Sequence, residues 1–186
     1  YYYPVEYMAA LMTSVIHNPS KVAEYILSSR KMQIEILPPD INFGESEFSA
    51  DHGAIRYGLS AIKSLGAPMI RAIVEERKEN GKYQSLRDFI ERMSGRELNK
   101  RAIENLIKAG ALDQVAGNRR QKLMVYAEIV DAVNQEKKNA MTGQMSLFDL
   151  ISDEEKEAYE IQMPKVEEYS KEELLSFEKE VLGVYI

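Results

Sequence analysis

The 186-residue sequence contains no cysteine and only two histidines, His17 and His52. Without cysteine the chain has no disulfide framework, no thiolate metal site and no cysteine nucleophile, which fits a reducing compartment such as the cytosol. The two histidines lie far apart and do not match a metal-ligand spacing. We therefore expect no bound metal, and we interpret His52, beside Gly53, as a turn residue.

Long apolar runs are also absent, because no stretch of about 18 apolar residues occurs. Residues 1–4 are not a basic region followed by a hydrophobic stretch, as an export signal requires. These absences predict a soluble, cytoplasmic protein without a membrane partner. The chain starts without methionine and ends on the apolar residues 181–186, which are typical of a strand awaiting a partner. We therefore interpret it as a piece of a longer protein.

The net charge is -6, but the charges are unevenly distributed. Residues 54–122 carry 15 Lys and Arg against 8 Asp and Glu, a block of +7, whereas residues 1–53 (3 against 7) and 151–186 (4 against 11) are acidic. A phosphate backbone responds to the potential within a Debye length, roughly 8–10 Å at ordinary salt. The basic block can therefore bind DNA inside an acidic protein, although on charge alone a solvated basic surface explains it equally well.

A chain of this length with 45% hydrophobic residues can bury one or two cores. Apolar residues at helical spacing predict helices over 4–15 and from Asn18 onward, and the run 34–37 before two prolines predicts a short strand. The sequence around residues 51–53 predicts a β-hairpin. Because the later segments are helical, the expected fold class is mainly α with a small β element.

Between residues 59 and 123 a pattern of helix, tight turn and helix occurs twice, with Gly66 and Gly110 at the turns. Backbone N–H groups at such a turn, together with the dipole of the next helix, form a cradle that suits one DNA phosphate. Neighbouring lysine and arginine side chains would add contacts that release counterions and ignore base sequence. The candidate DNA-binding residues are Lys63, Ser64, Leu65, Gly66, Ala67, Lys100, Arg101, Lys108, Ala109, Gly110, Ala111, Arg119 and Arg120.

An ordinary helical domain also needs glycine where its helices turn, so one such turn would indicate little. Two turns with adjacent lysines inside a strongly basic block favour DNA contact. The fuller helix-hairpin-helix pattern has two glycines around one apolar residue, whereas Ser64 and Lys108 occupy the first glycine position in this sequence.

A helix is predicted over residues 118–135, and a polar linker follows it. Within the linker lies a small hydrophobic island over residues 144–150, which begins with Gln144, Met145, Ser146, Leu147 and Phe148. Burying a Leu or Phe side chain is worth about 1.5–3 kcal/mol, so these two pack on this chain or on another. A Gln followed by a Leu-Phe pair resembles the short peptide that binds the bacterial sliding clamp, in which the apolar pair enters pockets.

The whole chain resembles the alpha subunits of bacterial DNA polymerase III. The segments that carry the resemblance keep the family's order and approximate spacing, and they are residues 3–10, 36–42, 55–63, 99–113, 144–148 and 178–183. In that family the corresponding region closes the fingers domain, continues through a tandem helix-hairpin-helix module that contacts duplex DNA, and carries the internal clamp-binding peptide.

The resemblance implies four parts. They are the end of the fingers domain (1–58), a tandem helix-hairpin-helix DNA-binding domain (59–137), a linker with the clamp-binding motif (138–152), and an acidic segment (153–186) leading to an OB-fold domain. The implied partners are double-stranded primer-template DNA, the sliding clamp and other replicase subunits.

Polymerase chemistry uses carboxylates that hold two metal ions, and this sequence has no Asp-x-Asp pair. We expect no active site and no cofactor in this chain, while the parent protein would be a DNA-directed DNA polymerase that uses Mg²⁺ in an upstream palm domain. Two other classes stay open. An independent helix-hairpin-helix module would leave residues 144–148 unexplained, and a pure protein-interaction scaffold would leave the lysine-bearing turns unexplained.

Overall fold

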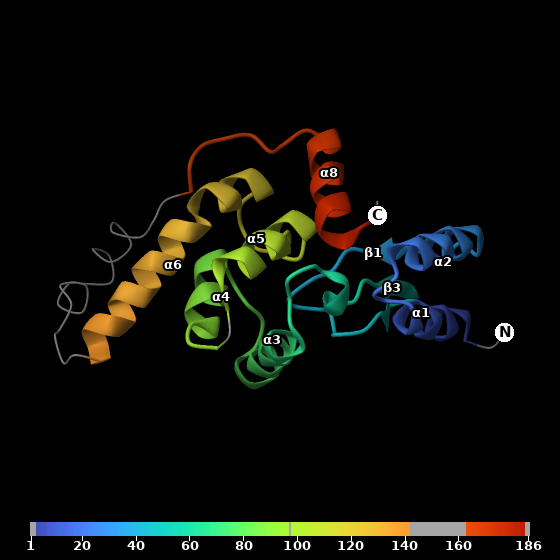
Figure 1. The fold of residues 1–186 in the computed structure, drawn as a ribbon, viewed down its shortest axis with the longest axis horizontal. Coiled ribbons are helices and arrows are strands. Elements are labelled where there is room, and N and C mark those ends of the chain that lie inside the picture. The colour runs from blue at the N-terminus through green and yellow to red at the C-terminus, as the bar shows by residue number, and fades with distance from the viewer. Residues whose placement is uncertain (1–2, 97, 142–162, 185–186) are drawn as a thin grey trace.

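The computed structural model describes residues 3–96, 98–141 and 163–184. Its elements in chain order are α1 (Pro4–Ser14), α2 (Pro19–Lys31), β1 (Ile36–Leu37), β2 (Ser49–Asp51), β3 (Ala54–Arg56), the 3-10 helix η1 (Leu59–Ala61), α3 (Ala67–Asn80), α4 (Leu86–Met93), α5 (Lys100–Ala109), α6 (Arg119–Met141) and α8 (Lys171–Leu182). The fold is mainly α with one small sheet, as expected from the sequence. Figure 1 shows an elongated arrangement, with α1 and α2 at one end and α6 at the other.

The first two helices begin where the sequence predicts. Pro4 occupies the first turn of α1, and the side chain of Asn18 caps α2 by accepting a hydrogen bond from the Lys21 amide. Met12 on α1 and Val22 on α2 are almost completely buried. The two helices pack on each other, and α1 also covers the strands β2 and β3.

The sheet has the order β1-β3-β2, with β1 parallel and β2 antiparallel to β3. The predicted hairpin is confirmed, and both His52 and Gly53 at its tip have positive φ. The predicted strand over 34–37 is shorter than expected, because only Ile36–Leu37 pairs with β3. Ile55, in the middle of the sheet, is fully buried.

One apolar core runs from the sheet through the helices α3 to α6 and reaches α8. Polar contacts join the same parts. The Tyr83 amide donates to the Asn42 side chain at 2.7 Å, and the Asn42 side-chain amide donates back to the Tyr83 carbonyl at 3.1 Å. Arg77 on α3 donates to the carbonyls of Ile41 and Gly44 at 2.9 and 2.7 Å. The segment between β1 and β2 is thereby fixed on α3. The expected domain boundary after residue 58 stays a prediction.

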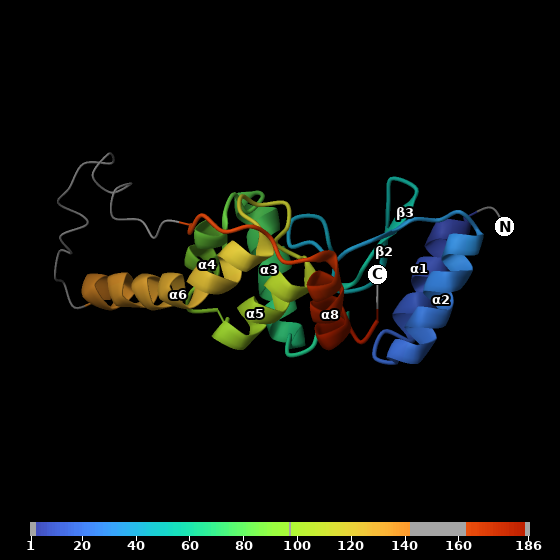
Figure 2. The same ribbon diagram turned by 90° about the horizontal axis from the view of Figure 1, so that it is seen from above.

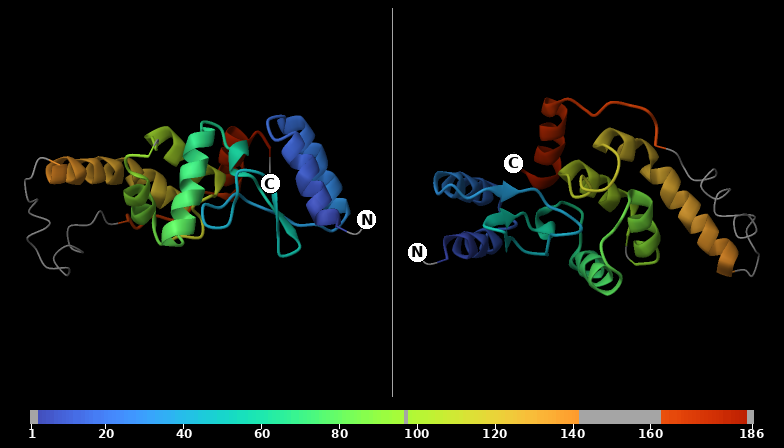
Figure 3. Two further views of the ribbon diagram at one scale, coloured as in Figure 1. Left: turned by 90° about the horizontal axis from the view of Figure 1, so that it is seen from below. Right: turned by 180° about the vertical axis from the view of Figure 1, so that it is seen from behind.

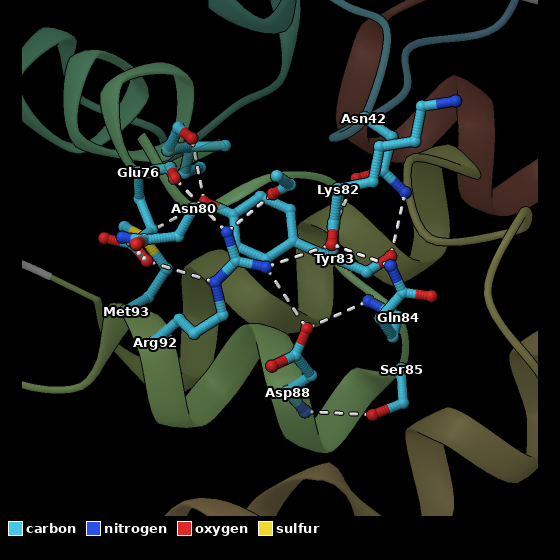
Figure 4. A network of polar contacts seen from close by, with 12 residues as sticks. Asn42, Glu76, Asn80, Lys82, Tyr83, Gln84, Ser85, Asp88, Arg92 and Met93 are labelled. Carbon is cyan, nitrogen blue, oxygen red and sulfur yellow. Dashed lines mark hydrogen bonds and ion pairs between the residues drawn. The ribbon is translucent and has the colours of Figure 1, made fainter. Parts of the chain in front are cut away.

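Arg92 on α4 binds residues at the C-terminal end of α3 (Figure 4). Its guanidinium donates to the Glu76 carboxylate at 3.1 Å and to the Gly81 carbonyl at 2.6 Å, and it lies 4.2 Å from the centre of the Tyr83 ring. The short α4 is capped by Ser85, whose side chain accepts from the Asp88 amide. These contacts fix the angle between α3 and α4.

The C-terminal part corrects one expectation from the sequence. Ser170 and Glu173 form a capping box at the start of α8, and Gly183 ends the helix in a left-handed conformation. Val181 and Leu182 are buried at the end of this helix. The prediction of a strand over 181–186 is therefore wrong for its described residues, because the cap starts a helix whose apolar side carries these residues into the core.

The described part of the acidic segment, residues 163–184, packs on the helical module. Helix α8 packs against α5, and the stretch before it passes over the start of α6 (Figure 2). There the side chains of Gln121 and Asn118 donate to the carbonyls of Pro164 and Val166 at 2.8 and 3.1 Å. The helix α6 runs to Met141, so the first residues of the expected linker from 138 onward are helical.

Across the described ranges, every helix is either too short or too polar to cross a membrane.

Candidate nucleic-acid interface

The first candidate turn, residues 63–67, lies on the surface. Lys63, Ser64, Gly66 and Ala67 are exposed, whereas the Leu65 side chain is buried and anchors the turn. Ser64 has a φ of 68°, which is the left-handed conformation that glycine adopts most easily. The serine at the first glycine position therefore keeps the backbone geometry of the pattern, at some conformational strain.

The backbone amides of this turn are open. Gly66 has an extended conformation (φ −78°, ψ 156°) at the N-cap of α3, and Pro68 follows in the first turn. The amides of Gly66 and Ala67 have no hydrogen-bond acceptor among the described residues, whereas residues 63 and 64 form a turn before them. Unpaired N–H groups at the N-terminus of a 14-residue helix attract anions, because the helix dipole adds partial positive charge there. The exposed Lys63 adds a full positive charge beside them.

The second candidate turn has a different geometry. Gly110 ends α5 in a left-handed conformation (φ 86°), and the next helix begins nine residues later at Arg119. The Gly110 and Ala111 amides donate to the carbonyls of Ile107 and Leu106, and both residues are buried, as is Ala109. The expectation that the amides around Gly110 are free is therefore wrong, because the glycine closes the preceding helix while Gly66 opens the following one.

Two of the expected cationic residues are occupied by carboxylates of the same chain. Lys108 contacts Glu104 at 3.1 Å and Glu180 at 3.3 Å. Burial lowers the pKa of the Lys108 ammonium, but the hydrogen bonds and negative charges of these two partners outweigh it, so that the pKa is raised. Arg119 is almost completely buried and contacts Asp113 at 2.9 Å and Glu178 at 3.0 Å.

The other three candidates lie on the surface. Lys100 forms an exposed ion pair with Asp131 at 2.9 Å, which solvent screens. Arg101 is exposed, and Arg120 is exposed with its guanidinium 5.9 Å from the centre of the Tyr169 ring. The structure thus separates the predicted site into one open turn at 63–67 and a second turn whose nearest charges are internally paired.

The chain is similar to a known family model and to several known proteins. Residues 33–122 match the family model described as "Helix-hairpin-helix motif". The DNA polymerase III subunit alpha of Borreliella burgdorferi is 38% identical over 184 residues, 99% of this chain and 16% of that protein. The proteins of the same name from Chlamydia trachomatis and Thermus aquaticus are each 38% identical over 185 residues, covering 99% and 100% of this chain and 15% and 14% of theirs.

The chain is homologous to one segment of bacterial DNA polymerase III subunit alpha. It spans about a sixth of the length of the relatives from Borreliella and Chlamydia. The family likeness expected from the sequence is thereby confirmed, as is the helix-hairpin-helix motif. The four-part division of the chain stays a prediction.

Two further cations lie on α3 and were not among the candidates expected from the sequence. Arg71 and Lys78 are exposed and lie two helical turns apart on the same face of α3, the helix that follows the open turn. Both line a shallow cavity of about 460 Å³ together with Ala67 and Glu45. Their spacing of seven residues on the helix that starts at Ala67 could have indicated them, since it places them on one face.

The clamp-binding candidates expected from the sequence, Gln144, Met145, Ser146, Leu147 and Phe148, lie outside the described residues. Within the described ranges, no group of three or more His, Asp or Glu side chains could hold a metal ion.

Proposed function

We propose that this chain is the part of a bacterial replicative DNA polymerase that holds the backbone of double-stranded DNA, and that it does so at the 63–67 turn. The observation that carries the proposal is the set of open amides at the start of α3 beside the exposed Lys63. The helix-hairpin-helix match over 33–122 and the DNA polymerase III alpha relatives support it.

In this proposal one phosphate accepts hydrogen bonds from the Gly66 and Ala67 amides, and the Lys63 ammonium neutralises it. Arg71 and Lys78 lie along α3 to meet further phosphates of the same backbone. Contacts of this kind fix the position of a duplex but distinguish no bases. Binding without sequence preference suits a protein that must move along its template.

The parent protein would catalyse DNA-directed DNA synthesis in chromosomal replication, in the cytoplasm, with Mg²⁺ bound elsewhere in its chain. The isolated segment would hold DNA without extending it, since its sequence has no Asp-x-Asp pair for two-metal chemistry. Primer extension by the isolated segment would contradict this assignment.

A second contact is proposed for residues 144–148. Their Gln and Leu-Phe pattern favours binding to the sliding clamp, which would tether the polymerase to its template. The motif itself is the support for this part of the proposal.

The proposed phosphate contact can be tested with two matched variants. Ala67→Pro removes one amide donor at the first helical position, where proline fits, and the ψ of 156° at Gly66 is the conformation that a residue before proline prefers. Gly66→Ala keeps the amide, and its added Cβ would approach the Pro68 side chain only at 3.7 Å.

Fluorescence anisotropy with a duplex at several salt concentrations provides the measurement. We expect Ala67→Pro to bind about tenfold more weakly, because a hydrogen bond to a charged group is worth about 1.5–3 kcal/mol. Gly66→Ala should bind within about twofold of the wild type, and all variants should bind more weakly as salt rises. Equal affinity of Ala67→Pro and wild type would refute the contact.

A further inference from the structure

The residue that precedes the open turn is held by hydrogen bonds on both sides of its backbone. The Lys63 amide donates to the Val181 carbonyl of α8 at 2.9 Å. The Lys63 carbonyl accepts from the side-chain amide of Asn105 on α5 at 2.7 Å, and Asn105 is 8% exposed. Two helices that follow much later in the sequence therefore hold the start of the turn.

The turn needs such support because little local structure precedes it. The 3-10 helix η1 has three residues, and Ile62 after it is already extended. Ser64 then adopts a left-handed φ that is unfavourable for a serine. A hydrogen bond weakens steeply when its angle departs from linearity, so amides can hold a phosphate only if the peptide planes of the turn are kept in place.

The helix α8 is in turn held by two basic residues, Lys108 before the second turn and Arg119 at the start of α6. Glu178 pairs with Arg119 and Glu180 pairs with Lys108. Figure 3 shows α8 beside α5, against which it packs. The end of α8 is also close to α2, because a Cβ on Gly183 would lie 2.9 Å from the Pro19 ring. Lys108 and Arg119, two of the cations expected to contact DNA, thus attach the helix that supports the first turn.

We propose that Asn105 is a positioning residue for phosphate binding by the 63–67 turn, and that α8 completes its support through the Val181 carbonyl and the Glu178–Arg119 pair. The region around the second turn, at Gly110, then holds the first turn in position. This inference rests on the proposed function and deepens it, since it assigns different roles to the two turns.

The first test compares Asn105→Ala with Ile107→Val in the full chain. Asn105→Ala removes the donor to the Lys63 carbonyl, whereas Ile107→Val trims a fully buried side chain of the same helix and leaves this hydrogen bond in place. We expect Asn105→Ala to weaken duplex binding about tenfold, as loss of one phosphate contact would. Its salt dependence should become shallower by about 0.9 in the slope of log K against log salt, one phosphate's worth. Ile107→Val should keep the affinity and the slope of the wild type.

The second test places Asn105→Ala in the Ala67→Pro background. If Asn105 acts through the turn, the double variant binds as weakly as Ala67→Pro alone, because coupled residues are not additive. Additive losses would overturn the positioning role and leave the phosphate contact standing. Wild-type binding by Ala67→Pro would instead refute the phosphate contact itself, so that the two failures are distinguishable.

Glu178→Gln provides a second variant if Asn105→Ala does not fold. It weakens the attachment of α8 and removes a negative charge, which by simple electrostatics should strengthen DNA binding. We expect weaker binding instead, with the shallower salt slope. Binding equal to or tighter than that of the wild type would overturn the inference.

Discussion

Lys122 shows how a single residue can contribute to the fold in a way that its type does not suggest. Its side chain is fully buried, and its ammonium donates to the carbonyls of Leu112 and Val115 at 2.6 and 3.1 Å. Burial lowers the pKa of this ammonium, and the negative charges of Asp113 and Glu168 only partly oppose that effect. Lys122 therefore fixes the loop between α5 and α6 and is unavailable to DNA, although it belongs to the basic block of the sequence.

We predict that Lys122→Met lowers the free energy of unfolding by about 1–3 kcal/mol, because two buried carbonyls lose their donor. Urea denaturation followed by circular dichroism measures the change. Lys138→Met on the exposed end of α6 is the matched control and should change stability by less than about 0.5 kcal/mol. A stability of Lys122→Met equal to that of the control would show that these hydrogen bonds contribute little.

Elements differ in how far their sequence determines their role. The two turns have the same local composition, with a lysine and a glycine between apolar residues. One opens a helix and the other closes one, because Gly66 is followed by Pro68 at the start of α3 whereas Gly110 follows a complete helix. Gly110 also lies against Arg119, whose guanidinium would be 2.5 Å from an added Cβ. Such a tertiary contact over nine residues leaves no periodic signal in the sequence.

Lys63→Glu and Lys108→Glu should therefore act differently. Lys63→Glu places a negative charge beside the open amides, and we predict at least tenfold weaker duplex binding with a salt slope shallower by about 1. Lys108→Glu places a carboxylate beside Glu104 and Glu180, so it should mainly lower the thermal midpoint through like-charge repulsion. Anisotropy titrations and thermal melts of both variants give the comparison. Equal losses of affinity at equal stability would indicate that both turns bind phosphate.

Most helices could be predicted from the sequence, since caps and apolar spacing are local. Asn18 and Ser85 cap α2 and α4, as their positions before apolar runs indicate. What the sequence could not show depends on distant partners: the pairing of Glu178 with Arg119, and the packing of α8 on α5. A strand was expected over 181–186 because a short apolar run has no periodicity that separates it from a buried helix end.

At the scale of the whole molecule, ion pairs join separate elements. Glu76 on α3 belongs to one group of them, with Arg92 on α4 (Figure 4). The hydrogen bond from Arg92 holds the pKa of the Glu76 carboxyl below its ordinary value of 4.5, and the hydrogen bond from Asn80 contributes. A carboxyl with a depressed pKa stabilises the folded state above its unfolded pKa. This contribution is lost as the pH falls through the folded pKa.

Glu76→Gln should therefore be less stable than the wild type at pH 7, and the difference should shrink as the pH falls below about 4.5, the ordinary glutamate value. Urea denaturation at a series of pH values measures both curves. Glu79→Gln, on an exposed position of the same helix, is the control and should follow the wild-type curve. A difference between Glu76→Gln and wild type that stays constant down to pH 3 would contradict the assignment.

The two proposed contacts of the chain should be separable, because they use different physics and different segments. Phosphate binding at 63–67 is electrostatic and weakens with salt, whereas anchoring through Leu147 and Phe148 depends on burying apolar surface and should respond little to salt.

We predict that Leu147→Ala with Phe148→Ala weakens binding to a purified sliding clamp by at least about a hundredfold, since each side chain is worth about 1.5–3 kcal/mol on burial. The same double variant should keep its DNA affinity. Surface plasmon resonance with immobilised clamp and anisotropy with duplex DNA measure the two contacts separately. Ala67→Pro is the reciprocal control, because it should lose affinity for DNA and keep the clamp. If either variant lost affinity for both DNA and the clamp, the two contacts would have to share a surface. Clamp binding could then not be independent of duplex binding.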